Sequence, residues 1–318
     1  MVNERRLGAS GLTIPPLILG GNVFGWTAER ETSFAILDAF VDGGGRMIDT
    51  ADSYSTWVPG HRGGESEAII GDWLRRRGRR DDILIATKVG AEVGGTKGLA
   101  PARIAAAIDG SLQRLGTDHI DLYFAHYDDP SVPLDDTLEA FDRLIGAGKV
   151  RAIGASNHDA ERLRQALDIS AQRGLAGYTV LQPHFNLLER ARFEGPLQDL
   201  CVARGIATVP YFALASGFLT GKYRRGADAS GAARGGAVRR YLDPHGQAVL
   251  AAVDAVAADA GATPAQVALA WLAAQRSVAA PIASATSVAQ VEELLGAMRL
   301  VLTLRQLAAL DAASRVEA

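Results

Sequence analysis

The chain has 318 residues, of which 48% are hydrophobic, with a formal net charge of −3 and a single cysteine, Cys201. This charge gives no general attraction to nucleic acid or to an anionic membrane, and one cysteine excludes an intrachain disulfide. Because the chain begins without a signal sequence and has no apolar run of about 18 residues, we expect a soluble, cytoplasmic protein.

The predicted elements alternate along the chain. Residues 5–14 read as a short hairpin that closes the bottom of a barrel. Eight strands are predicted next: Leu17–Gly20, Met47–Asp49, Ile83–Lys88, Ile120–Phe124, Val150–Ser156, Tyr178–Gln182, Ala207–Tyr211 and Ser277–Ile282. Helices between them include Thr32–Val41, Ser66–Arg77, Pro101–Leu115, Leu134–Ala147 and Pro264–Ala274. Without a linker that divides it, residues 1–318 are expected to form one parallel α/β domain.

Residues 226–246 interrupt this alternation. The stretch is rich in Gly and Ala, so it is not expected to hold a packed form alone. Because it follows the seventh strand on the side where strands end, we predict a flap-like insertion that closes over a bound ligand. A disordered excursion is the alternative.

Four polar side chains lie at or just past predicted strand ends: Asp49, Tyr54, Lys88 and His126. In a parallel barrel all strand C-termini open onto one face, so these groups are expected to converge. A phenol has an ordinary pKa of about 10, which a nearby ammonium lowers. We therefore predict Tyr54 as general acid or base, with its pKa lowered by Lys88. Asp49 holds the ammonium, and His126 orients a carbonyl or shares the proton.

Taken singly, each of these residues has a plainer interpretation as a turn residue, an exposed ring or a solvated charge. The joint pattern favours function. It comprises Asp-Thr-Ala-Asp-Ser-Tyr at 49–54, Ala-Thr-Lys at 86–88, Ala-His-Tyr-Asp at 125–128, Gly-Lys-Val-Arg-Ala-Ile-Gly-Ala-Ser-Asn at 148–157 and Gly-Phe-Leu-Thr-Gly-Lys-Tyr at 217–223. These motifs resemble the aldo-keto reductase family, in particular its branch similar to potassium-channel β subunits. Arginine outnumbers lysine 29 to 4, which is typical of a GC-rich bacterial genome.

The resemblance implies a (β/α)8 TIM barrel that reduces aldehydes and ketones with a nicotinamide cofactor, usually NADPH, or runs the reverse oxidation. It assigns the nicotinamide to Ser156, Asn157, Gln182 and Tyr211, since amides donate and accept hydrogen bonds and a phenol ring offers a flat face. A helix cap is the alternative role for Ser156. The other expected cofactor contacts are Gly21, Asn22, Asp49, Leu214, Ser216, Leu219, Lys222, Ser284, Thr286, Gln290 and Glu293.

Two segments depart from the family pattern. Phe212 and Ala213 replace the usual Ser and Pro, and Thr286 replaces the basic residue that pairs with the 2′-phosphate of NADPH. A charge-assisted bond contributes about 1.5 to 3 kcal/mol, so its loss is expected to weaken the preference for NADPH by roughly tenfold to a hundredfold. NADH is therefore possible as a cofactor, unless Arg234, Arg239 or Arg240 compensates. Leu294 also replaces a frequent Asn.

Trp26, Trp57 and Tyr127 follow strand ends and are predicted to wall the substrate pocket, with ordinary loop packing as the alternative. They indicate a small carbonyl or alcohol substrate without naming it, and the oligomeric state is not set by the sequence. The six histidines form no metal-binding pair, so we expect no metal. A regulatory β-like subunit with little turnover is the alternative function.

Overall fold

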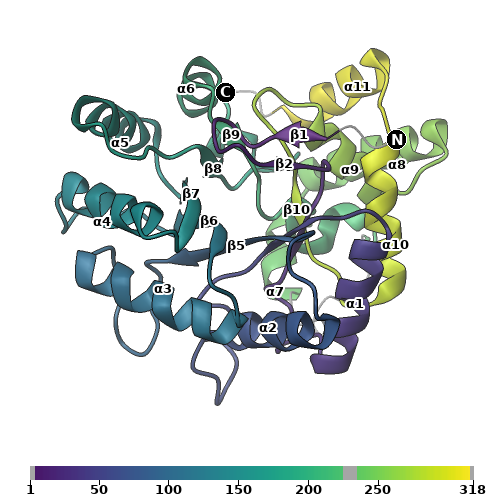
Figure 1. Ribbon diagram of the computed structural model, residues 1–318. Coiled ribbons are helices and arrows are strands. Elements are labelled where there is room, and N and C mark those ends of the chain that lie inside the picture. The colour runs from purple at the N-terminus through teal and green to yellow at the C-terminus, as the bar shows by residue number, and fades with distance from the viewer. Residues whose placement is uncertain (1–3, 225–234, 316–318) are drawn as a thin grey trace.

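The computed structural model of the chain describes residues 4–224 and 235–315. Its main sheet has eight parallel strands in the order β10-β3-β4-β5-β6-β7-β8-β9. Their bounds are Ile18–Gly20 (β3), Met47–Asp49 (β4), Leu84–Val89 (β5), Ile120–Ala125 (β6), Val150–Ser156 (β7), Val180–Gln182 (β8), Ala207–Thr208 (β9) and Ile282–Ala283 (β10). A bridge between Thr208 and Val278 joins the two edges of the sheet. The predicted (β/α)8 barrel is confirmed (Figure 1).

Helices surround the barrel (Figure 1). They are α1 (Arg30–Asp42), α2 (Glu65–Arg77), α3 (Pro101–Leu115), α4 (Leu134–Gly146), α5 (Ala160–Arg173), α6 (Pro196–Arg204), α7 (Gly235–Val238), α8 (Pro244–Ala260), α9 (Pro264–Ala273), α10 (Val288–Gly296) and α11 (Leu304–Ser314), with short 3-10 turns at Arg190–Arg192 (η1), Ala215–Thr220 (η2), Arg239–Tyr241 (η3) and Ala297–Arg299 (η4). Four of the helices begin with proline, whose fixed φ suits a first turn.

An antiparallel hairpin of β1 (Arg5–Arg6) and β2 (Thr13–Ile14) precedes the barrel, as predicted. Its buried Leu7, Leu12 and Ile14 join the side chains that fill the barrel interior. Gly8, at the turn, has φ +56°, and a Cβ there would lie 2.3 Å from the carbonyl oxygen of Thr179. The hairpin therefore packs against the barrel too closely for any side chain at this position.

The last two strands are shorter than predicted. The ladder of β9 ends at Thr208, two residues before Pro210, and β10 begins only after Pro281. Proline has no N–H to donate, so neither position can continue a parallel ladder. Ser277, where the eighth strand was expected to begin, has φ +64°, which is not a strand conformation. Of that predicted strand, Ile282 lies in the β10 ladder, and Val278 makes only an isolated bridge to Thr208.

Much of the predicted flap, residues 226–234, lies outside the described residues. The remainder, residues 235–246, forms α7, η3 and the start of α8, and its buried Val238 and Tyr241 pack inward. The ring of Tyr241 lies 5.8 Å from that of Phe218 in η2. Whether the stretch closes over a ligand stays a prediction.

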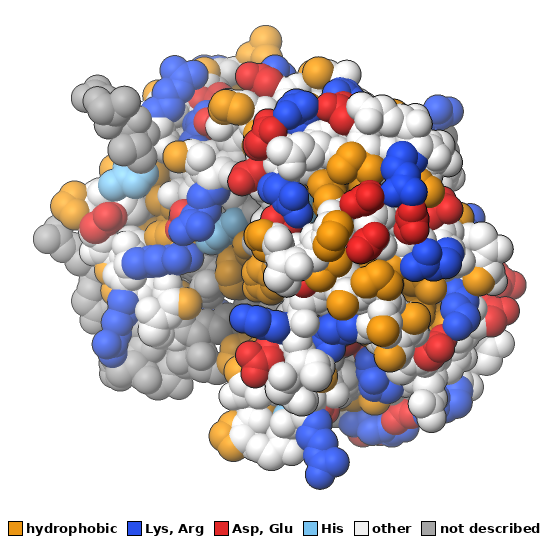
Figure 2. Space-filling view, turned by 90° about the vertical axis from the view of Figure 1, so that its left-hand side faces the viewer, with side chains coloured by type: hydrophobic (Ala, Val, Ile, Leu, Met, Phe, Trp, Pro, Cys, Tyr) orange, Lys and Arg blue, Asp and Glu red, His pale blue; other side chains and the backbone are white. Residues whose placement is uncertain are grey.

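Acidic and basic side chains alternate on the face shown in Figure 2, which includes α3 to α5. Ion pairs join Arg173 to Asp135 and Arg164 to Asp168 on these helices. In residues 4–224 and 235–315, no single helix combines the length and apolarity of a membrane span. The pair α8 and α9 reaches that composition only together, across a 95° bend.

Candidate functional site

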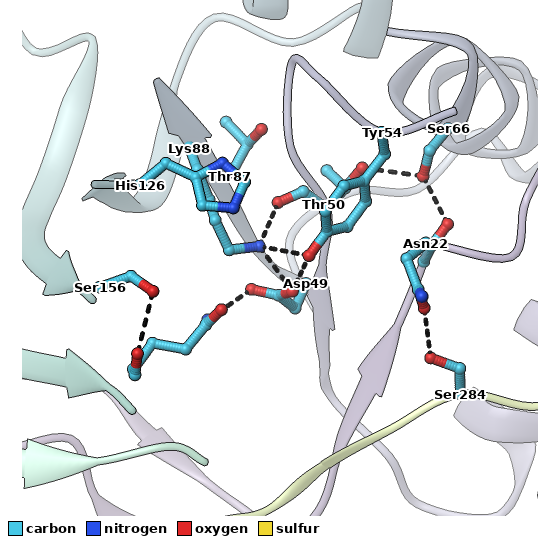
Figure 3. Close-up of polar contacts among 12 residues, drawn as sticks. Asn22, Asp49, Thr50, Tyr54, Ser66, Thr87, Lys88, His126, Ser156 and Ser284 are labelled. Carbon is cyan, nitrogen blue, oxygen red and sulfur yellow. Dashed lines mark hydrogen bonds and ion pairs between the residues drawn. The ribbon is translucent and has the colours of Figure 1, made fainter. Parts of the chain in front are cut away.

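The four predicted strand-end residues meet at one end of the barrel (Figure 3). Asp49 ends β4, Lys88 lies in β5, and His126 directly follows β6. The Lys88 ammonium donates hydrogen bonds to Asp49 Oδ2 at 2.7 Å and to the Tyr54 hydroxyl oxygen at 2.8 Å. Tyr54 in turn donates to Asp49 Oδ2 at 3.1 Å. The His126 ring lies 6.3 Å from the Tyr54 ring, edge to face.

Burial sets the charge states of this group. Lys88 is fully buried, and burial lowers its pKa while Asp49 opposes that shift. Burial and then the Asp49 carboxylate raise the pKa of Tyr54 well above its ordinary value. The expectation that Lys88 lowers this pKa is therefore not met. Burial, helped by Lys88, lowers the pKa of His126 to about 3, so its imidazole is neutral at neutral pH.

Four residues expected to hold a nicotinamide lie beside this group. Gln182 Nε2 donates to Asp49 Oδ1 at 2.8 Å, and Ser156 Oγ donates to the Gln182 carbonyl at 2.9 Å. Asn157 donates from Nδ2 to the His126 carbonyl and accepts from the Tyr211 hydroxyl at 2.7 Å. The alternative role for Ser156 as a helix cap is wrong, because Asp159 caps α5 through the Arg162 N–H.

A cavity of about 980 Å³ runs from these residues to α10. Of the predicted catalytic and cofactor residues, its lining includes Asn22, Asp49, Tyr54, His126, Ser156, Asn157, Gln182, Tyr211, Leu214, Ser216, Lys222, Ser284, Thr286, Gln290 and Glu293. Ser284 donates to Asn22 Oδ1 at 2.6 Å. The Thr286 N–H and hydroxyl both donate to Gln290 Oε1, which places Thr286 at the start of α10. A pocket of this size suits a whole cofactor.

Some predicted residues do not line this cavity. Lys88 and Leu219 are fully buried, and Gly21 contributes its carbonyl as an acceptor for Ser66 Oγ at 2.7 Å. Of the predicted pocket aromatics, Trp57 and Tyr127 line the cavity and are about half exposed. Trp26 is not among the lining residues, but it packs against Trp57 in a T-shaped contact with ring centroids 5.5 Å apart.

Other lining residues were not predicted as site residues. Loops after β3, β4 and β5 border the cavity with Thr27, Ser53, Thr56, Ala91 and Glu92. Their position after strand ends is the sequence feature that could have identified them. Phe212, which was noted in the sequence only because it replaces a Ser hydroxyl, also lines the cavity. Its backbone φ is +53°. The Thr50 carbonyl accepts a hydrogen bond from the Lys88 ammonium at 2.7 Å. Because this contact uses the backbone, it cannot be predicted from the residue type.

Comparisons with known proteins identify the family of this chain. The profile of the Aldo/keto reductase family matches residues 16–315. The chain is 34% identical over 306 residues to the Uncharacterized oxidoreductase YrpG of Bacillus subtilis, covering 93% of this chain and 91% of that protein. It is 32% identical over 305 residues to norsolorinic acid reductase B of Aspergillus parasiticus, covering 91% and 77%.

A relative named for a different role is equally similar. The chain is 31% identical over 308 residues to a probable voltage-gated potassium channel subunit beta of Arabidopsis thaliana, covering 93% of this chain and 91% of that protein. Enzymes and a channel subunit therefore share this sequence pattern. The family match spans nearly all of the barrel, and its strand ends carry the four residues described above. The chain belongs to the aldo/keto reductase family.

Proposed function

We propose that this chain is an oxidoreductase that interconverts a carbonyl compound and an alcohol, with Tyr54 as general acid and base. The observation that carries this is the placement of the Tyr54 hydroxyl, which contacts Lys88 at 2.8 Å and Asp49 at 3.1 Å beside the cavity. A bound nicotinamide supplies or accepts the hydride. In reduction, Tyr54 gives its proton to the carbonyl oxygen, and neutral His126 orients that oxygen by a hydrogen bond.

The residues present fit such a cofactor. Asn157 and Gln182 offer amide groups next to the flat Tyr211 ring, and the far end of the cavity reaches the first turn of α10. Helix N-termini favour anions such as phosphates. Lys222 is the one Lys or Arg among the described lining residues. We infer that NADPH is used with weak discrimination against NADH, because Thr286 carries no charge.

The test is turnover of a panel of aldehydes and ketones by the purified protein, followed through loss of reduced nicotinamide absorbance. Reduction that requires Tyr54 supports the proposal. Cofactor binding without turnover of any substrate would instead favour the alternative, a regulatory subunit like the channel-β relative. The substrate is proposed to be a small carbonyl compound, and the cytoplasmic location remains a prediction from the sequence.

A further inference from the structure

A second set of polar side chains, buried except for the partly exposed Arg103 and Arg114, lies next to the loop that carries Tyr54. Its members share no contact with the cavity and come from five elements: Asp52 from the loop after β4, Glu67 from α2, Thr87 from β5, Arg103 and Arg114 from α3, and Tyr123 from β6. Tyr123 packs in the core between the barrel and its helices. This buried cluster therefore lies outside the barrel wall, under α2 and α3.

Glu67 has a full set of partners within the buried cluster. Its Oε1 accepts from the Thr87 hydroxyl at 2.6 Å, and its Oε2 accepts from Arg114 Nε at 2.7 Å. A second Arg114 nitrogen lies 2.6 Å from the same oxygen. This ion pair compensates the charge of the buried Glu67 carboxylate. Arg114 is therefore bound to Glu67 and not to Asp52.

Asp52 has no such set. Its side chain is 6% exposed, its Oδ1 is buried without a hydrogen-bond partner among the described residues, and its Oδ2 lies 3.8 Å from an Arg103 nitrogen, too far for a hydrogen bond. A buried carboxylate without partners favours its neutral form. Burial first, and Glu67 second, raise the pKa of Asp52 to about 7. The cations Arg103, Arg114 and Lys88 act against this rise.

Arg103 is instead bonded to the wall of the cavity. One of its nitrogens donates to the Ala91 carbonyl at 2.7 Å, and the other donates to the Thr96 hydroxyl at 2.6 Å. Ala91 lines the cavity together with its neighbour Glu92. The Arg103 Nε is buried and has no partner among residues 4–224 and 235–315, so the guanidinium keeps a free donor there that a nearby anion can take.

We propose that Asp52 is a positioning residue that competes with the loop at residues 91–96 for Arg103. While Asp52 is protonated, Arg103 holds that loop as a wall of the cavity. When Asp52 ionises, the guanidinium closes the 3.8 Å gap and releases Ala91 and Thr96. Tyr123, whose buried hydroxyl has no hydrogen-bond partner in the described part of the chain, also faces Asp52. The effect on substrate rests on the proposed function, whereas the loop movement does not.

Hydrogen exchange of residues 91–96 tests the loop movement without substrate. Between about pH 6 and pH 8, protection corrected for intrinsic exchange should fall about fivefold, as expected for the loss of roughly one hydrogen bond. Asp52→Asn keeps the shape and cannot ionise, so its protection should stay at the low-pH level throughout. Asp118→Asn, on an exposed carboxylate, should behave as wild type. Protection in wild type that does not change with pH, or a change that persists in Asp52→Asn, overturns the proposal.

Arg103→Gln keeps the proposal testable if Asp52→Asn fails to fold. It should show the low protection of the high-pH state at every pH, and wild-type pH dependence in this variant also overturns the proposal. For the carbonyl substrate with the highest turnover, KM should rise about fivefold over the same range while kcat changes little. If exchange behaves as expected and no carbonyl is turned over, the proposed function fails and the role of Asp52 stands.

Discussion

Replacing Tyr54 by Phe removes one oxygen from the centre of the site and keeps the ring against Trp57 and His126. The lost hydroxyl is the atom that accepts from Lys88 and donates to Asp49. General acid catalysis contributes about 10² to 10⁴-fold to the rate, so kcat should fall by that factor. The loss corresponds to an increase of about 2.7 to 5.5 kcal/mol in the activation free energy. Losing a partner of the buried ammonium should also destabilise the fold, by about 1 to 3 kcal/mol.

The assay separates these effects. Steady-state kcat, cofactor dissociation constants from calorimetry and urea unfolding are measured on the same preparations. Cofactor affinity should stay near wild type, because the Tyr54 hydroxyl bonds to Lys88 and Asp49. Tyr178→Phe is the matched control, since Tyr178 is also buried and its hydroxyl bonds to none of the residues that the structure describes. A Tyr54→Phe enzyme that keeps most of its kcat would refute the assignment.

Three further predictions follow from single features. Because the pKa of Tyr54 is raised well above 10, Tyr54 keeps its proton at neutral pH, and kcat for reduction should be constant up to about pH 9. The rate of oxidation should instead increase with rising pH. A kcat for reduction that drops near neutral pH contradicts this prediction. Thr286→Arg should raise the NADPH to NADH ratio of kcat/KM by roughly tenfold to a hundredfold, and an unchanged ratio would mean that residue 286 does not face the phosphate. Gly71→Ala places a Cβ 2.1 Å from the Arg114 carbonyl oxygen, so it should lower the free energy of unfolding by about 1 to 3 kcal/mol, whereas Gly146→Ala, with open space, should not.

The barrel could be predicted because its strands are short apolar runs that end in polar residues. Apolar runs placed β4 and β7 with their observed bounds, and the alternation of polar and apolar residues located the N-terminal hairpin. The strand-end rule then brought Asp49, Lys88 and His126 to one face without knowledge of their distances. The predicted bounds of the last two strands were wrong because they included proline. Pro210 and Pro281 interrupt the hydrogen-bond ladder, although the chain still runs along the barrel at both positions.

The buried cluster around Asp52 was not predictable in the same way. Asp52 lies inside the motif at residues 49–54, yet nothing in its residue type tells whether the carboxylate has a partner. That depends on where Arg103 and Arg114 of α3 direct their guanidinium groups, which is decided by packing between α2 and α3. The same limit applies to Trp26, which was expected in the pocket wall and contacts the lining residue Trp57 without itself lining the cavity.

The pKa of Tyr54 shows why residue types alone do not give a charge state. Lys88 is close enough to stabilise a phenolate, which was the basis for expecting a lowered pKa. The same burial that brings the ammonium to 2.8 Å also removes water from the phenol, and Asp49 accepts from both groups. With the lysine charge already compensated by Asp49, burial prevails and the phenol keeps its proton. Tyr54 is therefore arranged as a proton donor, the role that the proposed carbonyl reduction requires.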